Sequence, residues 1–373
     1  MNFAFSEEQE ELRRTVRQFL EAKSPETEVR RLMETTEGYD PAVWKQMGQE
    51  LGLQSLAIPE EYGGQGFTAI ELGIVLEEMG RVLLCAPYFS SVVLAANAIL
   101  NAGTDAQKKD LLPGIASGDT IATLAFTEPS GKWDAAGITL EVGADNKLNG
   151  EKMFVLDGHT ADLIVVVARQ AGTTGTDGIG FYTVRGDADG LTRTPLQTMD
   201  MTRKQAKLEF NGVAAEPLGE PGKGFAAFSK TLDQAAVALA NESMGGAQFV
   251  LDMSVQYAKD RVQFGRPIGS FQAIKHKCAD MLLEVESGKS AAYYASWAAA
   301  EDNEELPVVA ALSKAYCSEA YFHATAENIQ IHGGIGFTWE HPAHLYFKRA
   351  KSSELLFGDP SYHRELLAQR IGI

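Results

Sequence analysis

The chain has 373 residues, of which 45% are hydrophobic and 22% are charged, enough for two or three domains with large cores. Its 50 acidic residues outnumber 33 basic ones and give a formal net charge of -17. This charge argues against a surface for nucleic acid or for an anionic membrane, because both need a basic footprint.

Three cysteines, Cys85, Cys278 and Cys317, are too widely spaced for a zinc cluster and too few for a disulfide framework. We interpret them as buried thiols in a reducing compartment and expect no bound metal. The first 20 residues are too acidic for a transit peptide and lack the order of a secretory signal. No apolar run reaches transmembrane length, so we expect a cytoplasmic protein without a membrane partner.

Residues 1–120 are predicted to form a helical domain. Ser6 and Gln9 have the spacing of a capping box before an amphipathic helix. Apolar periodicity predicts further helices over 69–82 and 90–100, and another that begins at Asp105.

Residues 121–225 are predicted to form a β domain, because short runs with a period of two are separated by Gly, Asp and Asn. The Gly- and Thr-rich stretch at 171–180 is typical of a mobile hairpin loop. Residues 226–373 are again helical, with long helices near 226–260, 270–300 and 307–331 and a last one at the end. Pro267 and Pro307 are expected between these helices. The fold class is therefore α+β, with a carboxy-terminal antiparallel four-helix bundle.

Two segments of the last domain have the residue types of an anion site. The run from Arg261 to Lys277 gathers cationic side chains and two phenylalanines around one corner, where guanidinium groups and helix amino termini favour phosphate. The alternative is a solvated basic face. The run from Gln330 to Phe337 follows a helix, and its glycines expose backbone N–H groups or simply end the helix. It follows no strand, unlike a Rossmann fingerprint.

Four segments together resemble the acyl-CoA dehydrogenase family over essentially the whole chain. They are TEP at 127–129, NGEKMFVLDG at 149–158, RVQFGRPIGSFQAIKHKCADM at 261–281 and IQIHGGIGFTWEHP at 329–342. The resemblance extends to the subgroup with pimeloyl-CoA and steroid side-chain acyl-CoA dehydrogenase subunits. It implies a helical domain, a middle β domain and a helical bundle, assembled as dimers or tetramers.

The resemblance implies FAD as cofactor and assigns residues to it. Contacts to the pyrophosphate and adenosine across a subunit interface fall on Arg261, Phe264, Gln272, Gln330, Gly333 and Gly334. Thr127 matches a hydroxyl that bonds the flavin ring, although an ordinary strand threonine is the alternative. Phe154 stands where the family has a tryptophan against the flavin. Leu156 replaces a Thr or Ser that bonds flavin N5, so this hydrogen bond is missing.

The resemblance also places the acyl-CoA thioester. Trp133 replaces a small residue beside the acyl thioester, and Asp233 matches an aspartate that some members use on CoA. Phe357 occupies the position of the usual catalytic glutamate and still offers its backbone N–H to the thioester carbonyl.

The carboxylate base that removes the α proton is absent from both usual positions. Phe357 occupies one, and Ala235 and Ala236 occupy the other. Glu242 and Asp359 are the carboxylates nearest in sequence and are the two candidates for the base. The alternatives are that Glu242 pairs with a neighbouring cation, that Asp359 caps a turn, and that neither is the base.

The implied reaction is α,β-desaturation of an acyl-CoA thioester, with electrons passed to an electron-transfer flavoprotein. The resemblance implies that the chain works alone or with a catalytic partner that carries the base, in a homo- or hetero-oligomer with a homologous subunit. A non-catalytic subunit that supports the FAD of its partner is one alternative. An acyl-CoA oxidase that reduces oxygen directly is another.

Overall fold

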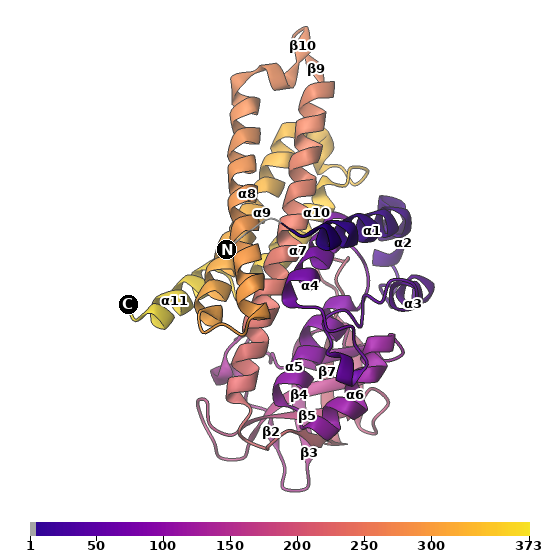
Figure 1. The fold of residues 1–373 in the computed structure, drawn as a ribbon, viewed down its shortest axis with the longest axis vertical. Coiled ribbons are helices and arrows are strands. Elements are labelled where there is room, and N and C mark those ends of the chain that lie inside the picture. The colour runs from indigo at the N-terminus through magenta and orange to yellow at the C-terminus, as the bar shows by residue number, and fades with distance from the viewer. Residues whose placement is uncertain (1–4) are drawn as a thin grey trace. The chain divides into compact units, whose positions relative to one another are not determined.

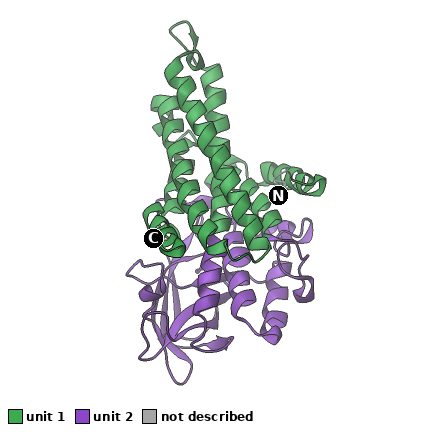
Figure 2. Cartoon of the chain, turned by 60° about the vertical axis from the view of Figure 1, so that its left-hand side comes forward, with its two compact units in different colours: residues 1–30, 69–84, 236–373 green, residues 31–68, 85–235 purple. Residues whose placement is uncertain are grey.

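The computed structural model describes residues 5–373 and divides the chain into two compact units (Figure 2). Unit 1 contains Met1–Arg30, Ala69–Leu84 and Ala236–Ile373, and unit 2 contains Arg31–Thr68 and Cys85–Ala235. Each unit therefore combines segments that are far apart in sequence. The three consecutive domains expected from the sequence, 1–120, 121–225 and 226–373, stay a prediction.

The helices that begin the chain form where local signals predict them. Helix α1 (Glu7–Lys23) begins with the capping box, because Gln9 N donates to Ser6 Oγ and Ser6 N donates to Gln9 Oε1. Helices α2 (Glu26–Met33) and α3 (Pro41–Gln49) follow. Helix α4 (Ala69–Arg81) packs on α1, where Arg13 and Arg17 pair with the buried carboxylate of Glu78. A π-helical segment (Phe89–Ala95), α5 (Ala96–Ala102) and α6 (Asp105–Ser117) belong to unit 2.

Long helices build the rest of unit 1. They are α7 (Phe225–Asp260), which begins in unit 2, α8 (Gln272–Ala300) and α9 (Leu306–His332). A hairpin of β9 (Val262–Gln263) and β10 (Arg266–Pro267) joins the ends of α7 and α8 (Figure 1). Gly288 lets α8 approach α7, since a Cβ there would lie 2.3 Å from Met244 Sδ. Pro307 lies in the first turn of α9, where proline is tolerated, and not between helices as expected.

The end of the chain forms two helices where the sequence analysis expected one. Helix α10 (Ala343–Leu355) ends before a short loop, and α11 (Pro360–Ile371) begins after it. Phe357 and Gly358 have φ values of 63° and 107°, which no helix accommodates. Pro360 then begins the new helix. Proline lacks an N–H, and at the first helical position no hydrogen bond within the helix is lost.

A mixed sheet forms the β part of unit 2. Its strands are β1 (Ala122–Ala125), β2 (Glu141–Val142), β3 (Lys147–Leu156), β4 (Leu163–Gln170), β5 (Ile179–Arg185), β6 (Leu191–Pro195), β7 (Gln205–Ala214) and β8 (Glu216–Leu218). Their order is β6-β7-β3-β2-β4-β5-β8, and β1 pairs in parallel with β4. The π-helical segment packs on β1 through Ser91, whose hydroxyl bonds both the N–H and the carbonyl of Ala122.

The Gly- and Thr-rich stretch connects β4 and β5 as the expected hairpin, and Arg169 holds it. The guanidinium donates to the carbonyls of Gly175 and Asp177 at 3.0 and 3.2 Å. The α+β fold class with helical, β and helical parts is confirmed. None of the helices among residues 5–373 is long and apolar enough to span a lipid bilayer. No three His, Cys, Asp or Glu side chains of these residues come together in a group able to hold a metal ion.

Candidate functional site

The Thr127 segment of unit 2 is anchored to strand β3. Met153 N donates to the carbonyl of Thr127 at 2.8 Å, and Lys152 Nζ donates to the carbonyl of Phe126 at 3.1 Å. Thr127 is 3% exposed, and no other described residue hydrogen-bonds its hydroxyl. Phe154 follows Met153 in β3, so the structure brings the backbone of Thr127 close to that of Phe154. Two residues that are both expected to contact the flavin need to lie close together.

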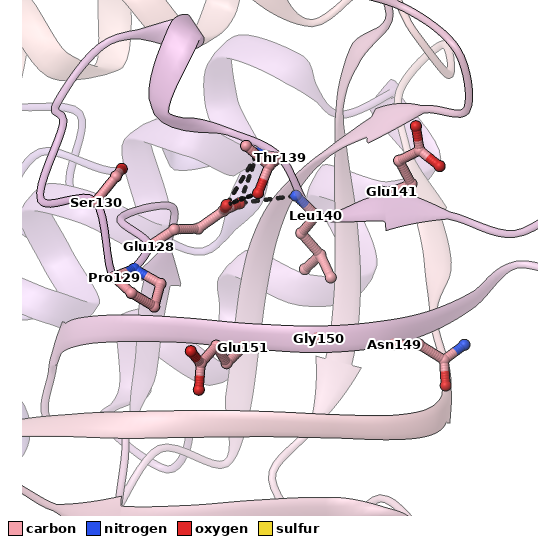
Figure 3. Close-up of a pocket in the computed structure, with 9 residues that line it drawn as sticks. All are labelled: Glu128, Pro129, Ser130, Thr139, Leu140, Glu141, Asn149, Gly150 and Glu151. Atoms are coloured by element: carbon pink, nitrogen blue, oxygen red, sulfur yellow. Dashed lines mark hydrogen bonds between the residues drawn. The ribbon is translucent and has the colours of Figure 1, made fainter.

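Glu128 fastens the same segment through a fully used carboxylate. It accepts a hydrogen bond from Lys152 Nζ at 2.7 Å. It also accepts from the backbone N–H groups of Thr139 and Leu140 at 2.9 Å (Figure 3). Burial alone would raise the pKa of Glu128, but Lys152 and these donors lower it. Burial lowers the pKa of Lys152 to about 8, against the attraction of Glu128. The pair holds the Thr127 segment in place.

A surface pocket of about 530 Å³ lies beside Glu128 in unit 2. Its lining residues are Glu128, Pro129, Ser130, Thr139, Leu140, Glu141, Asn149, Gly150 and Glu151 (Figure 3). Three glutamates make this pocket unsuited to the phosphates of CoA. The residues expected to bind flavin or thioester are not part of its lining.

Phe154 leaves the regular pleat of β3. The pairing of β3 with β7 shifts register between Lys152 and Val155, and Phe154 has a φ of 57°. This bulge turns the ring outward, where it is 39% exposed, while Leu156 is buried. A non-glycine residue with positive φ is strained, and such strain is frequent at functional sites.

Trp133 joins an aromatic cluster next to the Thr127 segment. Its ring centroid lies 5.9 Å from that of Phe126, which in turn lies 5.4 Å from Phe228 on α7. Asp233, five residues further along α7, is 6% exposed. Unit 2 therefore gathers Thr127, Trp133 and Phe126 around one short segment, and Asp233 lies on the helix that the aromatic cluster contacts.

The hairpin between α7 and α8 presents Arg261, Phe264 and Gln272 as exposed side chains. Phe264 is 91% exposed, and positive φ values at Phe264 and Gly265 define a two-residue type I′ turn. A fully exposed phenylalanine in a strained turn has no role in the core of its own unit. Part of the basic corner is structural, since Lys277 pairs with Glu327.

The glycine run after α9 meets the hairpin end of the bundle. The ring of His332 stacks on Tyr257, near the end of α7, with centroids 4.1 Å apart. Gln330, Gly333 and Gly334 are exposed, and a Cβ at either glycine would meet nothing within 4 Å. The backbone there is open to a ligand, and both segments expected to hold the cofactor lie at one end of unit 1.

Glu242 lies on α7 and binds Arg349 of α10. Its Oε1 accepts from Arg349 Nη1 at 2.7 Å, and the two residues are 6% and 3% exposed. This is the ion pair that the sequence analysis held as the alternative to a catalytic role. Gly80 of α4 lies against the same turn, where a Cβ would come within 2.0 Å of the Glu242 carbonyl.

Asp359 caps α11, as the second alternative held. Its Oδ1 accepts from Tyr362 N at 2.8 Å, and the side chain is exposed. Phe357, two residues earlier, is 4% exposed with a φ of 63°. Phe154, Phe264 and Phe357 therefore share a left-handed backbone, and the sequence analysis assigned all three to the cofactor or the thioester.

Two buried side chains at this loop escaped the sequence analysis. Lys314 of α9 donates to the Gly358 carbonyl, and His363 of α11 hydrogen-bonds the Phe357 carbonyl. A lysine within the apolar stretch VVAALSKAYC was the only sequence signal for the first. Arg349 was missed as well, because its partner is distant in sequence.

Comparison with known proteins identifies the class. Models of the acyl-CoA dehydrogenase N-terminal, middle and C-terminal domains match residues 6–119, 123–213 and 222–372. The acyl-CoA dehydrogenase IpdE2 of Mycolicibacterium smegmatis is 38% identical over 95% of this chain and 96% of its own length. The chain belongs to the acyl-CoA dehydrogenase family.

Solved structures agree. Butyryl-CoA dehydrogenase from Megasphaera elsdenii has a TM-score of 0.93 and 28% identity and covers 100% of both chains. A chain of the ChsE4–ChsE5 complex from Mycobacterium tuberculosis has a TM-score of 0.89 and 27% identity, over 100% of this chain and 99% of that one. The resemblance to the family and its subgroup is confirmed. The protein is an oxidoreductase that acts on the CH–CH group of acyl-CoA with a flavin cofactor.

The residues present fit a flavin. In unit 2, a buried threonine hydroxyl and an outward aromatic ring supply a donor and a stacking surface, and in unit 1 an open glycine backbone supplies N–H groups. When bound, a flavin would supply the acceptor for the hydride that leaves the β carbon of the thioester. The chain's own residues would supply its binding and orientation.

Proposed function

We propose that the chain is one subunit of an FAD-dependent acyl-CoA dehydrogenase whose catalytic carboxylate is supplied by a homologous partner chain. The observation that carries this proposal is the engagement of both candidate carboxylates. Glu242 is held by Arg349, and Asp359 caps α11. Phe357 stands at the usual position of the base.

A general base needs an oxygen within hydrogen-bond reach of the proton that it removes. The Glu242 oxygen that would do this already binds a buried guanidinium, and withdrawing it would break a buried ion pair. Asp359 directs a carboxylate oxygen to the first turn of α11 instead. Both contacts favour structural roles.

FAD is assigned to residues in both units. We propose that Thr127 and Phe154 contact the flavin ring, and that the pyrophosphate and adenosine of a second subunit's FAD meet Arg261, Phe264, Gln272, Gln330, Gly333 and Gly334. Lys314 lies beside the Phe357 loop. The end of α9 near the hairpin lies about 27 Å from Lys314 along the helix, at a rise of about 1.5 Å per residue. Such a separation supports a cofactor shared between subunits.

The acyl-CoA thioester is assigned to Trp133, Asp233 and Phe357. Trp133 narrows the space for the acyl group, and Asp233 hydrogen-bonds CoA. The backbone N–H of Phe357 polarises the thioester carbonyl, because a backbone donor does not depend on the side chain. The electrons then pass to an electron-transfer flavoprotein. A dimer or tetramer in the cytoplasm is the expected assembly.

Coexpression tests the pairing. The chain is expressed alone and with a homologous chain encoded beside it, and FAD content and bleaching by a panel of acyl-CoA thioesters are measured. We expect bound FAD, and bleaching only when the partner is present. Complete bleaching of the isolated chain would assign the base to this chain. Peroxide formation at the rate of turnover would favour an oxidase, and absence of bleaching in every complex would contradict the proposal.

A further inference from the structure

Lys314 is a buried cation whose three protons all meet neutral oxygens. The residue is 1% exposed, and its Nζ donates to Ser318 Oγ at 3.1 Å, to the Glu354 carbonyl at 3.1 Å and to the Gly358 carbonyl at 3.0 Å. An ammonium group has three donors, so each is used. Two of the acceptors are backbone carbonyls on either side of Phe357.

His363 holds the adjacent carbonyl of the same loop. Its Nε2 lies 3.0 Å from the Phe357 oxygen, and burial keeps the ring neutral by lowering its pKa to about 3. A neutral imidazole has one N–H, so the carbonyl partner requires that Nε2 carry it. The other side of this peptide is also bonded, because Gly358 N donates to the Leu355 carbonyl at 3.2 Å.

These contacts fix the backbone on both sides of Phe357. The Phe357–Gly358 peptide is held at its oxygen and its nitrogen, the following carbonyl is held by Lys314, and Leu356 N donates to the Ser352 carbonyl. Phe357 keeps a left-handed φ of 63°, which a side chain of this size adopts only where its surroundings determine it. These contacts flank the Leu356–Phe357 peptide and restrict the directions that its N–H can take.

We propose that Lys314 and His363 are positioning residues, which hold the Phe357 turn so that its backbone N–H points at the thioester carbonyl oxygen. This inference rests on the proposed thioester site and deepens it. The two residues form a clamp, because they bond the backbone carbonyls of Glu354, Phe357 and Gly358. It makes carbonyl recognition depend on two residues that do not touch the acyl group.

Lys314 is the member of this cluster that titrates near neutral pH. Burial lowers its pKa to about 7, while Glu354, Cys317 and Asp359 raise it. Burial raises the pKa of the Cys317 thiol to about 12, and His363 is neutral above about pH 3. Above its pKa the lysine loses one of its three donors, so the clamp weakens as pH rises through about 7.

The test compares a thioester with an analogue that lacks the carbonyl. The FAD-loaded full chain, with its partner where one co-purifies, is titrated with butyryl-CoA and with S-butyl-CoA, or with the matched pair whose acyl chain binds best. The variants are Lys314→Met, which keeps the length without donors, and His363→Leu. His363→Gln, which keeps an N–H, is the conservative variant, and Lys289→Met of α8 is the matched control.

We define the preference as the ratio of the dissociation constant of the analogue to that of the thioester. We expect Lys314→Met and His363→Leu to reduce this preference by roughly tenfold, with FAD content unchanged. His363→Gln and Lys289→Met retain the preference. In the wild type the preference decreases as the pH is raised from about 6 to about 9, and Lys314→Met abolishes this pH dependence. If Lys314→Met does not fold, the two His363 variants and the wild-type pH series decide.

Unchanged preference in both donor-free variants, or a flat wild-type pH series, would overturn the clamp. Failure of the proposed function gives a different result, because the wild type itself would then show no flavin response to any thioester. An equal loss in His363→Leu and His363→Gln would also count against the clamp, since one of them keeps the donor.

Discussion

Glu242 and Arg349 form a buried ion pair in which Glu242 Oε1 lies 2.7 Å from Arg349 Nη1, across 107 positions of sequence. The pair joins α7 to α10. The sequence analysis made Glu242 a candidate base. Because its carboxylate is engaged in this ion pair, we expect it to contribute to the stability of the fold and not to catalysis.

The first prediction is that this pair stabilises unit 1 only while both members are present. Glu242→Met or Arg349→Met lowers the free energy of unfolding by about 3–5 kcal/mol, since each removes the ion-pair partner of a buried charge. The double variant loses much less free energy of unfolding than the sum of the losses in the two single variants. Urea unfolding measures this, with Glu319→Gln as control: Glu319 pairs with Arg364 at the surface, and the cost there is under about 1 kcal/mol. Additive losses would contradict the coupling.

The second prediction concerns the base itself. In a catalytically active preparation, Glu242→Gln and Asp359→Asn leave the rate of flavin reduction per bound FAD within a few-fold of the wild type. Removal of a true general base costs roughly 100-fold or more. Stopped-flow reduction by the best acyl-CoA decides, because normalising to bound FAD separates chemistry from loss of folded protein. A loss of that size in either variant assigns the base to this chain.

The third prediction is a gain of function. Phe357→Glu places a carboxylate where the family resemblance expects the base, and burial raises its pKa towards that of an effective base. We expect flavin reduction in the isolated chain with this variant and none with Phe357→Gln, which matches its shape without the charge. Equal behaviour of the two variants would show that more than the base is missing.

The fourth prediction is that Arg261→Ala removes most of the bound FAD. A charge-assisted contact to phosphate is worth about 1.5–3 kcal/mol, so affinity falls by roughly 10- to 150-fold. Equilibrium titration with FAD measures the change. Arg185→Ala, which removes an exposed arginine of the β part, serves as the control and leaves affinity unchanged. Unaltered FAD stoichiometry and affinity in Arg261→Ala would rule out the assignment.

The fifth prediction uses the neutral state of His363. Burial and Lys314 lower its pKa from 6.5 to about 3, with Arg370 acting in the same direction and Asp359 opposing. Between these values the unfolded chain binds the extra proton, so the free energy of unfolding falls as pH drops below 6.5, by up to about 1.4 kcal/mol per pH unit. Unfolding at about pH 6.5 and about pH 4.5 is compared with His363→Gln, which should lose roughly 2 kcal/mol less. Parallel losses would contradict a buried neutral histidine.

The sequence by itself determined the local structure and the family. The Ser6–Gln9 capping box begins α1 because its hydrogen bonds join residues three positions apart. The segments around Thr127, Arg261 and Gln330 carried the family resemblance, and the comparisons confirm it. Signals of this kind depend on neighbours in the chain, so they can be read without a fold.

Only the tertiary structure decided how the critical side chains are used. Glu242 finds its counter-ion 107 residues away, Lys314 reaches the loop at Gly358 from 44 residues away, and the bulge at Phe154 follows from pairing with β7. Burial is the physical reason. A charge removed from water must find partners wherever the fold places them, and sequence spacing does not encode which distant helix that will be.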